Sequence, residues 1–208
     1  IGLAVVLMLK AAGVRRVIAS DYSPGRRRLA EACGADVVVD PGATSPWEVL
    51  AEEKGVVTSV TRLYGDGLDA LHALRRVPRL PWWTVVKAAQ RLGVGPRGPV
   101  VFECVGVPGV IDDIVTHAPF LSRVVVVGVC MEPDTFRPTM AVNKELDLRF
   151  SFCYDPVEFR ETLHLVADGT VDPRPLITDV VGLDGVAAAF EALGSADEQA
   201  KILIDPQG

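Results

Sequence analysis

Short runs of β-branched residues alternate along the chain with segments in which apolar residues recur every three to four positions. This alternation predicts βαβ units arranged around a parallel sheet. Helices are expected over residues 2–12, 24–33, 46–53, 67–76, 82–92, 108–117, 156–168 and 184–193, the last with Asp184 as its N-cap. Strands are expected over residues 17–20, 36–39, 100–104, 123–129, 146–152, 176–181 and 201–204. The predicted fold class is α/β with a doubly wound parallel sheet.

The alternation is interrupted between residues 54 and 99, which carry eight Lys or Arg side chains against two Asp. Two helices separated by Pro78 and Pro81 are predicted within this basic insertion. Three interpretations of it stay open. The insertion is a surface elaboration with solvated basic faces, a lid over an active site, or an oligomer contact anchored by Trp82 and Trp83.

Composition narrows the class of protein further. The chain has 208 residues, 49% of them hydrophobic, and a formal net charge of −6, which argues against a dedicated partner for nucleic acid or an anionic membrane. No apolar run is long enough to cross a bilayer, so no membrane partner is expected. Cys33, Cys104, Cys130 and Cys153 form no CxxC pair, which favours reduced, buried thiols in a cytoplasmic protein.

The first chemical signal is a glycine at the start of a predicted helix and an aspartate at the end of the next strand. Asp21 stands 19 positions after Gly2. In a dinucleotide site the helix N-terminus faces the pyrophosphate, and an acidic residue about 20 positions further on binds the ribose hydroxyls. Taken alone, the pair also fits any α/β protein that has a carboxylate at the end of a strand.

Four segments together resemble a known family. They are IGLAVVLMLKAAGVRRVIASD, VVFECVGVPG, SRVVVVGV and AKILIDP, in this order along the chain. They resemble the cofactor half of the zinc-type medium-chain dehydrogenases, and the stretch NKELDLRFSFCY resembles the polyol and threonine dehydrogenase branch. The resemblance covers nearly the whole chain except residues 54–99.

The resemblance implies a homo-oligomeric oxidoreductase that moves a hydride between NAD and an alcohol or carbonyl substrate with the help of zinc. Residues 1–154 would form a Rossmann-type dinucleotide-binding domain whose first strand is missing, and residues 155–208 would belong to a catalytic domain. The zinc ligands and the proton relay would lie in an N-terminal domain that this sequence does not contain. We therefore expect an inactive portion of a dehydrogenase, with no catalytic or metal-binding residue of its own.

The resemblance also implies which residues contact the cofactor. They are Ile1 and Gly2 at the pyrophosphate, Asp21, Tyr22 and Arg26 at the adenosine, Cys104, Val105, Gly106, Val127, Gly128 and Val129 after two central strands, and Phe152 and Cys153 at the nicotinamide. The side chains of Val127 and Val129 are expected in the core, with only their backbone facing the cofactor. Asp21 favours NAD over NADP because a carboxylate repels a 2′-phosphate, although Arg26, Arg27 and Arg28 stand nearby.

Two features depart from the family pattern. Residues 150–154 read Phe-Ser-Phe-Cys-Tyr where the polyol and threonine branch usually has Gly-Ser-Phe-Arg-Tyr, which puts a polyol or amino-acid substrate in doubt. The strand that joins the halves of the sheet would precede Ile1. We therefore expect either a fragment or direct pairing of the two halves, with the apolar faces around Phe159, Leu163, Phe190 and Leu193 partly uncovered.

Alternatives to this function stay open. The chain could belong to a zinc-free, NADPH-using reductase of the quinone-reductase type, or to a module that binds NAD without turnover. His72, His117 and His164 lack a partner at ligand spacing and are expected at the surface or at helix ends. Asp112 and Asp113 are expected to be a solvated pair on a helix.

Overall fold

The computed structural model describes residues 1–95, 98–194 and 199–208 and divides into two compact units. Unit 1 comprises Ile1–Glu48 and Phe152–Gly208, and unit 2 comprises Val49–Ser151. Arg97, counted above in the basic insertion, lies outside the described residues. The proposed division of the chain near residue 154 into a dinucleotide-binding part and a catalytic part stays a prediction.

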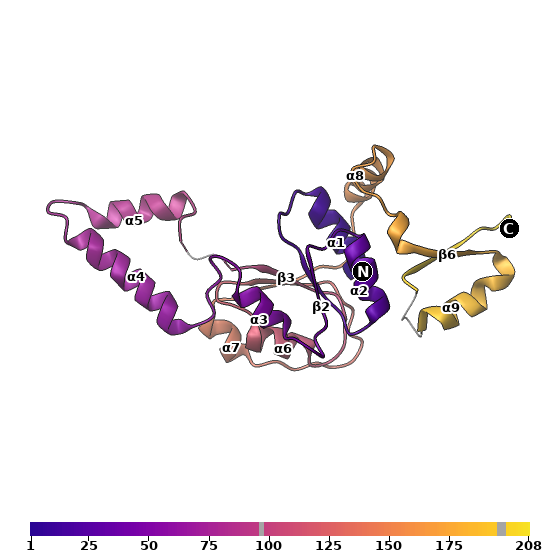
Figure 1. Cartoon of the computed structure of the whole chain (residues 1–208), viewed down its shortest axis with the longest axis horizontal. Helices are drawn as coiled ribbons and strands as arrows, with labels where there is room; N and C mark the ends of the chain where they lie inside the picture. The colour runs from indigo at the N-terminus through magenta and orange to yellow at the C-terminus, as the bar shows by residue number, and fades with distance from the viewer. Residues whose placement is uncertain (96–97, 195–198) are drawn as a thin grey trace. The chain divides into compact units, whose positions relative to one another are not determined.

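Unit 1 contains two small parallel sheets with helices beside them (Figure 1). Its elements are α1 (Gly2–Ala11), β1 (Ile18–Ser20), α2 (Pro24–Ala32), β2 (Val37–Val39), α8 (Pro156–Ala167), η1 (Arg174–Leu176), β6 (Ile177–Val181), η2 (Leu183–Gly185), α9 (Val186–Gly194) and β7 (Lys201–Ile204). Strand β1 pairs with β2, and β6 pairs with β7. Buried Val6, Val17 and Cys33 join α1, β1 and the end of α2, and Leu176 packs against this cluster. Leu176 thereby connects the C-terminal segment to the N-terminal one.

Unit 2 is a three-stranded parallel sheet with helices and a helical hairpin. Its elements are α4 (Val60–Arg75), α5 (Trp82–Arg91), β3 (Val100–Glu103), α6 (Val110–His117), β4 (Arg123–Val126), α7 (Pro138–Asn143) and β5 (Asp147–Phe150), while α3 (Pro46–Ala51) spans the boundary between the units. The strand order is β3–β4–β5, and Val124 of the central strand is fully buried. Lys144 donates hydrogen bonds to the Val115 and Thr116 carbonyls in the last turn of α6, and burial lowers the pKa of its ammonium group.

The α/β class and the parallel pairing are confirmed, but a single doubly wound sheet is not formed. The strands of the described residues fall into three separate sheets, β1–β2, β3–β4–β5 and β6–β7. Within these ranges no strand is hydrogen-bonded to both β1 and β3, and the two do not pair with each other. The prediction that the halves pair directly is therefore wrong for this part of the chain.

Several local predictions need correction. Helix α4 begins at Val60, seven residues before the expected position, because the Ser59 hydroxyl caps it by accepting the Arg62 amide at 3.2 Å. Helix α7 was not expected at all. Asp184 does not cap α9, since it lies inside the 3-10 turn that precedes this helix. Of the four free thiols only Cys33 is buried, whereas Cys153 is exposed.

The three histidines lie at the surface, as expected. His72, His117 and His164 are exposed in the last turns of their helices. Asp113 is exposed as expected and lies 3.0 Å from His117, whereas Asp112 is half-buried and binds Arg137 at 2.8 Å. The hydrogen bond from Arg137 lowers the pKa of the Asp112 carboxyl.

The apolar faces expected to be uncovered are exposed, namely Phe159 and Leu163 on α8 and Phe190 and Leu193 on α9. In the described ranges, no helix combines the length and the apolar character that crossing a bilayer requires.

Candidate cofactor-binding site

One solvent-exposed contact in unit 1 fixes the position of the end of α1. Lys10, near the end of α1, donates to both carboxylate oxygens of Asp36 at 3.0 Å, and Asp36 Oδ2 accepts the Val17 amide at 2.7 Å. The end of α1 therefore lies at the amino edge of β1 and β2. The hydrogen bond from Lys10, followed by that from Val17, lowers the pKa of the Asp36 carboxyl.

The same contact places Gly2 and Asp21 at one edge. Going back from Lys10 to Gly2 along α1 covers about 12 Å at the rise of an α-helix. Going forward from Val17 to Asp21 along β1 covers about 13 Å at the rise of a strand. Crossover helices of α/β folds run antiparallel to the strands beside them, so we expect both paths to lead to the carboxyl edge of the small sheet. This is the edge at which open α/β sheets bind their ligands.

The start of α1 offers unpaired backbone donors at this edge. Its N-cap residue, Ile1, provides no side-chain hydrogen bond, and the first turn holds no acidic residue. The first N–H groups of a helix lack intrahelical acceptors and carry the positive end of the helix dipole. The N-terminus of α1 is thus suited to an anion such as a phosphate.

Asp21 is held in place by its own turn. Its Oδ1 accepts the Ser23 amide at 2.8 Å, and its Oδ2 lies 3.9 Å from an Arg26 guanidinium nitrogen. Arg27 donates to the Asp21 and Tyr22 carbonyls at 2.8 Å and binds Asp40 at 2.9 Å, which ties the ends of β1 and β2 together. The predicted group Asp21, Tyr22 and Arg26 is therefore brought together, while Arg27 is occupied by the turn itself.

The carboxyl edge of unit 2 is organised by a residue that the sequence reasoning missed. Glu103, the last residue of β3, is only 3% exposed. Its Oε1 accepts the Val105 amide at 2.6 Å and the Gly106 amide at 2.7 Å. Its backbone carbonyl accepts the Val127 and Gly128 amides at 2.8 and 2.9 Å. One glutamate thus holds the loop after β3 against the loop after β4.

The two loops meet backbone to backbone. Gly106 has a φ of +70°, and a Cβ atom added there would lie 2.6 Å from the Val129 nitrogen. A Cβ atom on Gly128 would lie 2.5 Å from the Gly106 nitrogen and 2.6 Å from Glu103 Oε2. Real Cβ atoms do not approach other atoms so closely, so both positions require glycine. Cys104, Val105 and Gly106 are therefore brought together with Val127, Gly128 and Val129 as the sequence predicted.

The side chains at this edge differ from the expectation in part. Val129 is 64% exposed, so its predicted place in the core is wrong: β4 ends at Val126, and Val129 lies beyond it in the loop. Val127 is half-buried. Burial raises the pKa of the Cys104 thiol, which keeps it protonated at neutral pH. Phe152 and Cys153 lie after β5 and are exposed.

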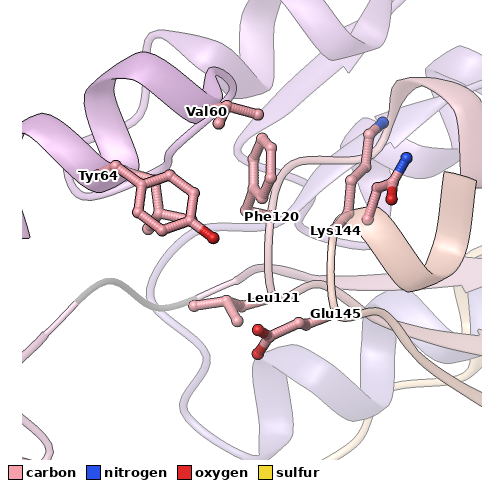
Figure 2. A pocket seen from close by; sticks show the side chains of 8 residues that line it. Val60, Tyr64, Phe120, Leu121, Lys144 and Glu145 are labelled. Carbon is pink, nitrogen blue, oxygen red and sulfur yellow. The ribbon is translucent and has the colours of Figure 1, made fainter.

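Metal ligands do not accompany these residues in the part of the chain that the structure describes. The described ranges hold no cluster of three or more His, Cys, Asp or Glu side chains that could bind a metal ion. A shallow pocket is present at the opposite, amino edge of the unit 2 sheet. Figure 2 shows it between α4, which contributes Val60 and Tyr64, and the loops that contribute Phe120, Leu121, Lys144 and Glu145. Those loops precede β4 and β5, so the pocket is not part of the carboxyl edge.

Comparison with known proteins identifies sequences and structures to which this chain is similar. The family model described as "Zinc-binding dehydrogenase" matches residues 1–74. The (R,R)-butanediol dehydrogenase of Neisseria gonorrhoeae is 30% identical over 99% of this chain and 48% of its own length. Human sorbitol dehydrogenase is 25% identical over 92% of this chain and 43% of its own length. The crystal structure of 2R,3R-butanediol dehydrogenase from Bacillus subtilis superposes with a TM-score of 0.66 at 26% identity, over 99% of this chain and 48% of that one.

Over nearly its whole length the chain is therefore similar to zinc-binding medium-chain dehydrogenases of the butanediol and sorbitol dehydrogenase branch. It spans about half the length of the curated relatives that it matches.

Proposed function

We propose that this chain is the NAD-binding portion of a zinc-assisted dehydrogenase that oxidises an alcohol or polyol or reduces the corresponding carbonyl. The observation that supports the proposal is the contact of Lys10 with Asp36, from which we infer that Gly2 and Asp21 lie at one edge. A helix N-terminus and a strand-end carboxylate at one edge are the two groups that a dinucleotide needs for its phosphates and its ribose.

Each group has a separate role in this proposal. The α1 amides after Ile1 and Gly2 bind the pyrophosphate, and Asp21 accepts hydrogen bonds from the adenosine ribose. Tyr22 and Arg26 border the adenine. The loops 104–106 and 127–129, together with Phe152 and Cys153, line the nicotinamide half, and the bound NAD supplies the hydride acceptor. This chain's contribution is to bind and orient the cofactor.

The zinc belongs to a different part of such an enzyme. The residues present do not fit a catalytic zinc, since no ligand cluster occurs in the described ranges. The relatives are about twice as long as the matched region. We therefore assign no metal ligand and no proton-transfer residue to this chain. Metal analysis of the native protein separates this proposal from a zinc-free, NADPH-using reductase.

The test is a titration of the native full-length protein with NADH and NADPH, followed by nicotinamide fluorescence. Asp21→Asn keeps the shape of the side chain but removes a charged acceptor, and one hydrogen bond to a charged group contributes about 1.5–3 kcal/mol. The Kd for NADH should therefore rise about 10- to 150-fold. The Kd for NADPH should not rise, because the carboxylate opposes a 2′-phosphate.

The matched control is Asp40→Asn, the same substitution at the end of β2, where Asp40 binds Arg27. Its Kd for NADH should stay within about threefold of the parent protein, a difference of less than 1 kcal/mol. An unchanged Kd in the Asp21→Asn protein contradicts the assignment of Asp21. A parent protein that binds neither dinucleotide contradicts the proposed function as a whole.

A further inference from the structure

The basic insertion is rooted at the edge of the sheet opposite the proposed cofactor site. On its entry side the Val57 carbonyl accepts the Phe120 amide at 2.9 Å, and on its exit side the Pro99 carbonyl accepts the Arg123 amide at 3.0 Å. Phe120 and Arg123 lie just before and at the start of β4. Both ends of the insertion are therefore fixed at the amino edge of β3 and β4, while the loops 104–106 and 127–129 follow the carboxyl ends.

From this root the insertion extends as a hairpin of α4 and α5, which run side by side away from the sheet (Figure 1). Helix α4 has 16 residues and is therefore about 24 Å long. A hairpin that starts at the amino edge and extends away from it does not cover the carboxyl edge of its own sheet. The interpretation of the insertion as an active-site lid is therefore not supported.

The hairpin exposes an apolar and aromatic surface. Tyr64 and Leu68 lie one turn apart on α4 and are 65% and 52% exposed, and Trp83 at the start of α5 is 56% exposed. Val77 in the connection between the helices is also exposed. Large exposed apolar groups that gather on one element mark interaction surfaces.

From the last turns of α4 onward the charged side chains of the hairpin are basic and mostly arginine, whereas its two acidic residues, Asp66 and Asp69, lie earlier in α4. Residues 70–102 contain six Lys or Arg and no Asp or Glu. Arg75, Arg76 and Arg79 lie at the far end and form no ion pair with any described residue. Arginine, tyrosine and tryptophan are the residue types enriched in protein–protein interfaces, whereas lysine is depleted there. This composition favours a protein partner over a lipid or nucleic-acid surface.

A complementary surface exists on the chain itself. Residues 152–208 carry eleven Asp or Glu against three Lys or Arg. Glu161 on α8, Asp184 in η2 and Glu191 on α9 are all exposed. Opposite charges on two segments of one sequence allow two copies to associate through a two-fold axis, with each hairpin on the acidic segment of the other copy. A two-fold axis produces two such hairpin contacts in each dimer. Together they can approach the area of about 800 Å² on each partner that a stable interface buries.

We propose that the α4–α5 hairpin is an oligomerisation arm that docks on the acidic surface around Glu161, Asp184 and Glu191 of a second copy of this protein. The contact is electrostatic at Arg75, Arg76 and Arg79 and apolar around Trp83. It is independent of cofactor binding, and it lies at the edge of unit 2 away from the proposed cofactor loops.

The test is the mass of the native full-length protein in analytical ultracentrifugation at 10 µM and low salt, a concentration of the order at which moderate interfaces form. The triple variant R75E/R76E/R79E should lose at least half of the parent's oligomeric mass, and 500 mM salt should have the same effect on the parent. Trp83→Ser should weaken association in the same direction. R15E/R28E, which reverses two exposed arginines outside the hairpin, is the matched control and should keep the parent's mass.

A charge exchange identifies the partner surface. E161K/D184K/E191K should also lose association, and mixing it with R75E/R76E/R79E should restore a complex, because the reversed charges attract again. Equal masses of the parent and R75E/R76E/R79E overturn the proposal, as does a mixture that does not associate. Hairpin-dependent binding to vesicles of phosphatidylserine or to duplex DNA, with no change in oligomeric mass, also overturns it. Circular dichroism of each variant confirms that a lower mass is not the result of unfolding.

Discussion

The buried carboxylate of Glu103 provides a quantitative test of how the carboxyl edge of unit 2 is held together. Its Oε1 accepts two backbone amides, those of Val105 and Gly106, at 2.6 and 2.7 Å. A hydrogen bond to a charged group contributes about 1.5–3 kcal/mol, and an amide left without an acceptor costs about 1–3 kcal/mol when it is buried. Val105 is exposed, so water replaces part of the loss. We expect Glu103→Ala to lower the free energy of unfolding by about 2–4 kcal/mol.

Glu103→Gln separates the charge from the hydrogen bonds. The glutamine side chain keeps one acceptor oxygen but has no negative charge, so the free energy of unfolding should fall by about 1–2 kcal/mol. Urea unfolding measures the global effect, and amide hydrogen exchange at Val105 and Gly106 measures the local one. Glu132→Ala, at an exposed glutamate in the same unit, is the control and should change stability by less than about 0.5 kcal/mol. Glu103 does not hold the two loops in this way if Glu103→Ala lowers the free energy of unfolding by less than about 1 kcal/mol, or if hydrogen exchange at the Val105 and Gly106 amides is unchanged.

Two further predictions follow from the same structure. Gly106→Ala should destabilise the protein by about 1–3 kcal/mol more than Gly109→Ala. Both glycines have positive φ, but only a Cβ at Gly106 would lie within 3 Å of a backbone atom. Equal midpoints of urea unfolding in the two variants contradict this prediction. The hydrogen bond from Arg174 lowers the pKa of Asp172 from 3.8 to about 2, so its stabilising effect is complete above pH 4 and is lost as the pH falls towards 2. The midpoint temperature of thermal unfolding should therefore change less for Asp172→Asn than for the parent between pH 4 and pH 2. Equal changes in the two proteins would show that the ion pair does not contribute to stability.

The local elements could be predicted from the sequence because their signals are local. The glycines at 13 and 34 end α1 and α2, and both adopt positive φ. Strands β1 and β3 are short, mostly apolar runs that end at Ser20 and Glu103, directly before Asp21 and Cys104. The pairing of the loops after β3 and β4 was also expected, since consecutive parallel strands bring their carboxyl ends together.

What the sequence did not predict depends on contacts between distant residues. Whether β1 and β3 share a sheet depends on a strand between them, which no local pattern specifies. Glu103 was passed over because an acidic residue in an apolar run is usually counted as a strand end, and its two hydrogen bonds appear only when the loop folds back on it. An acidic residue at the end of an apolar strand, with a glycine three positions further on, is the signal that could have found it.

The position of the hairpin, in contrast, follows from topology even though the sequence analysis left it open. In a βαβ unit the helix returns the chain from the carboxyl edge to the amino edge, so any segment inserted between that helix and the next strand starts and ends at the amino edge. The insertion precedes β3, and its ends are hydrogen-bonded to Phe120 and Arg123 at the amino edge of the unit 2 sheet. An insertion after a strand would instead reach the ligand edge. The place of an insertion in the order of elements therefore decides whether it can serve the active site or a partner, and here it favours the partner.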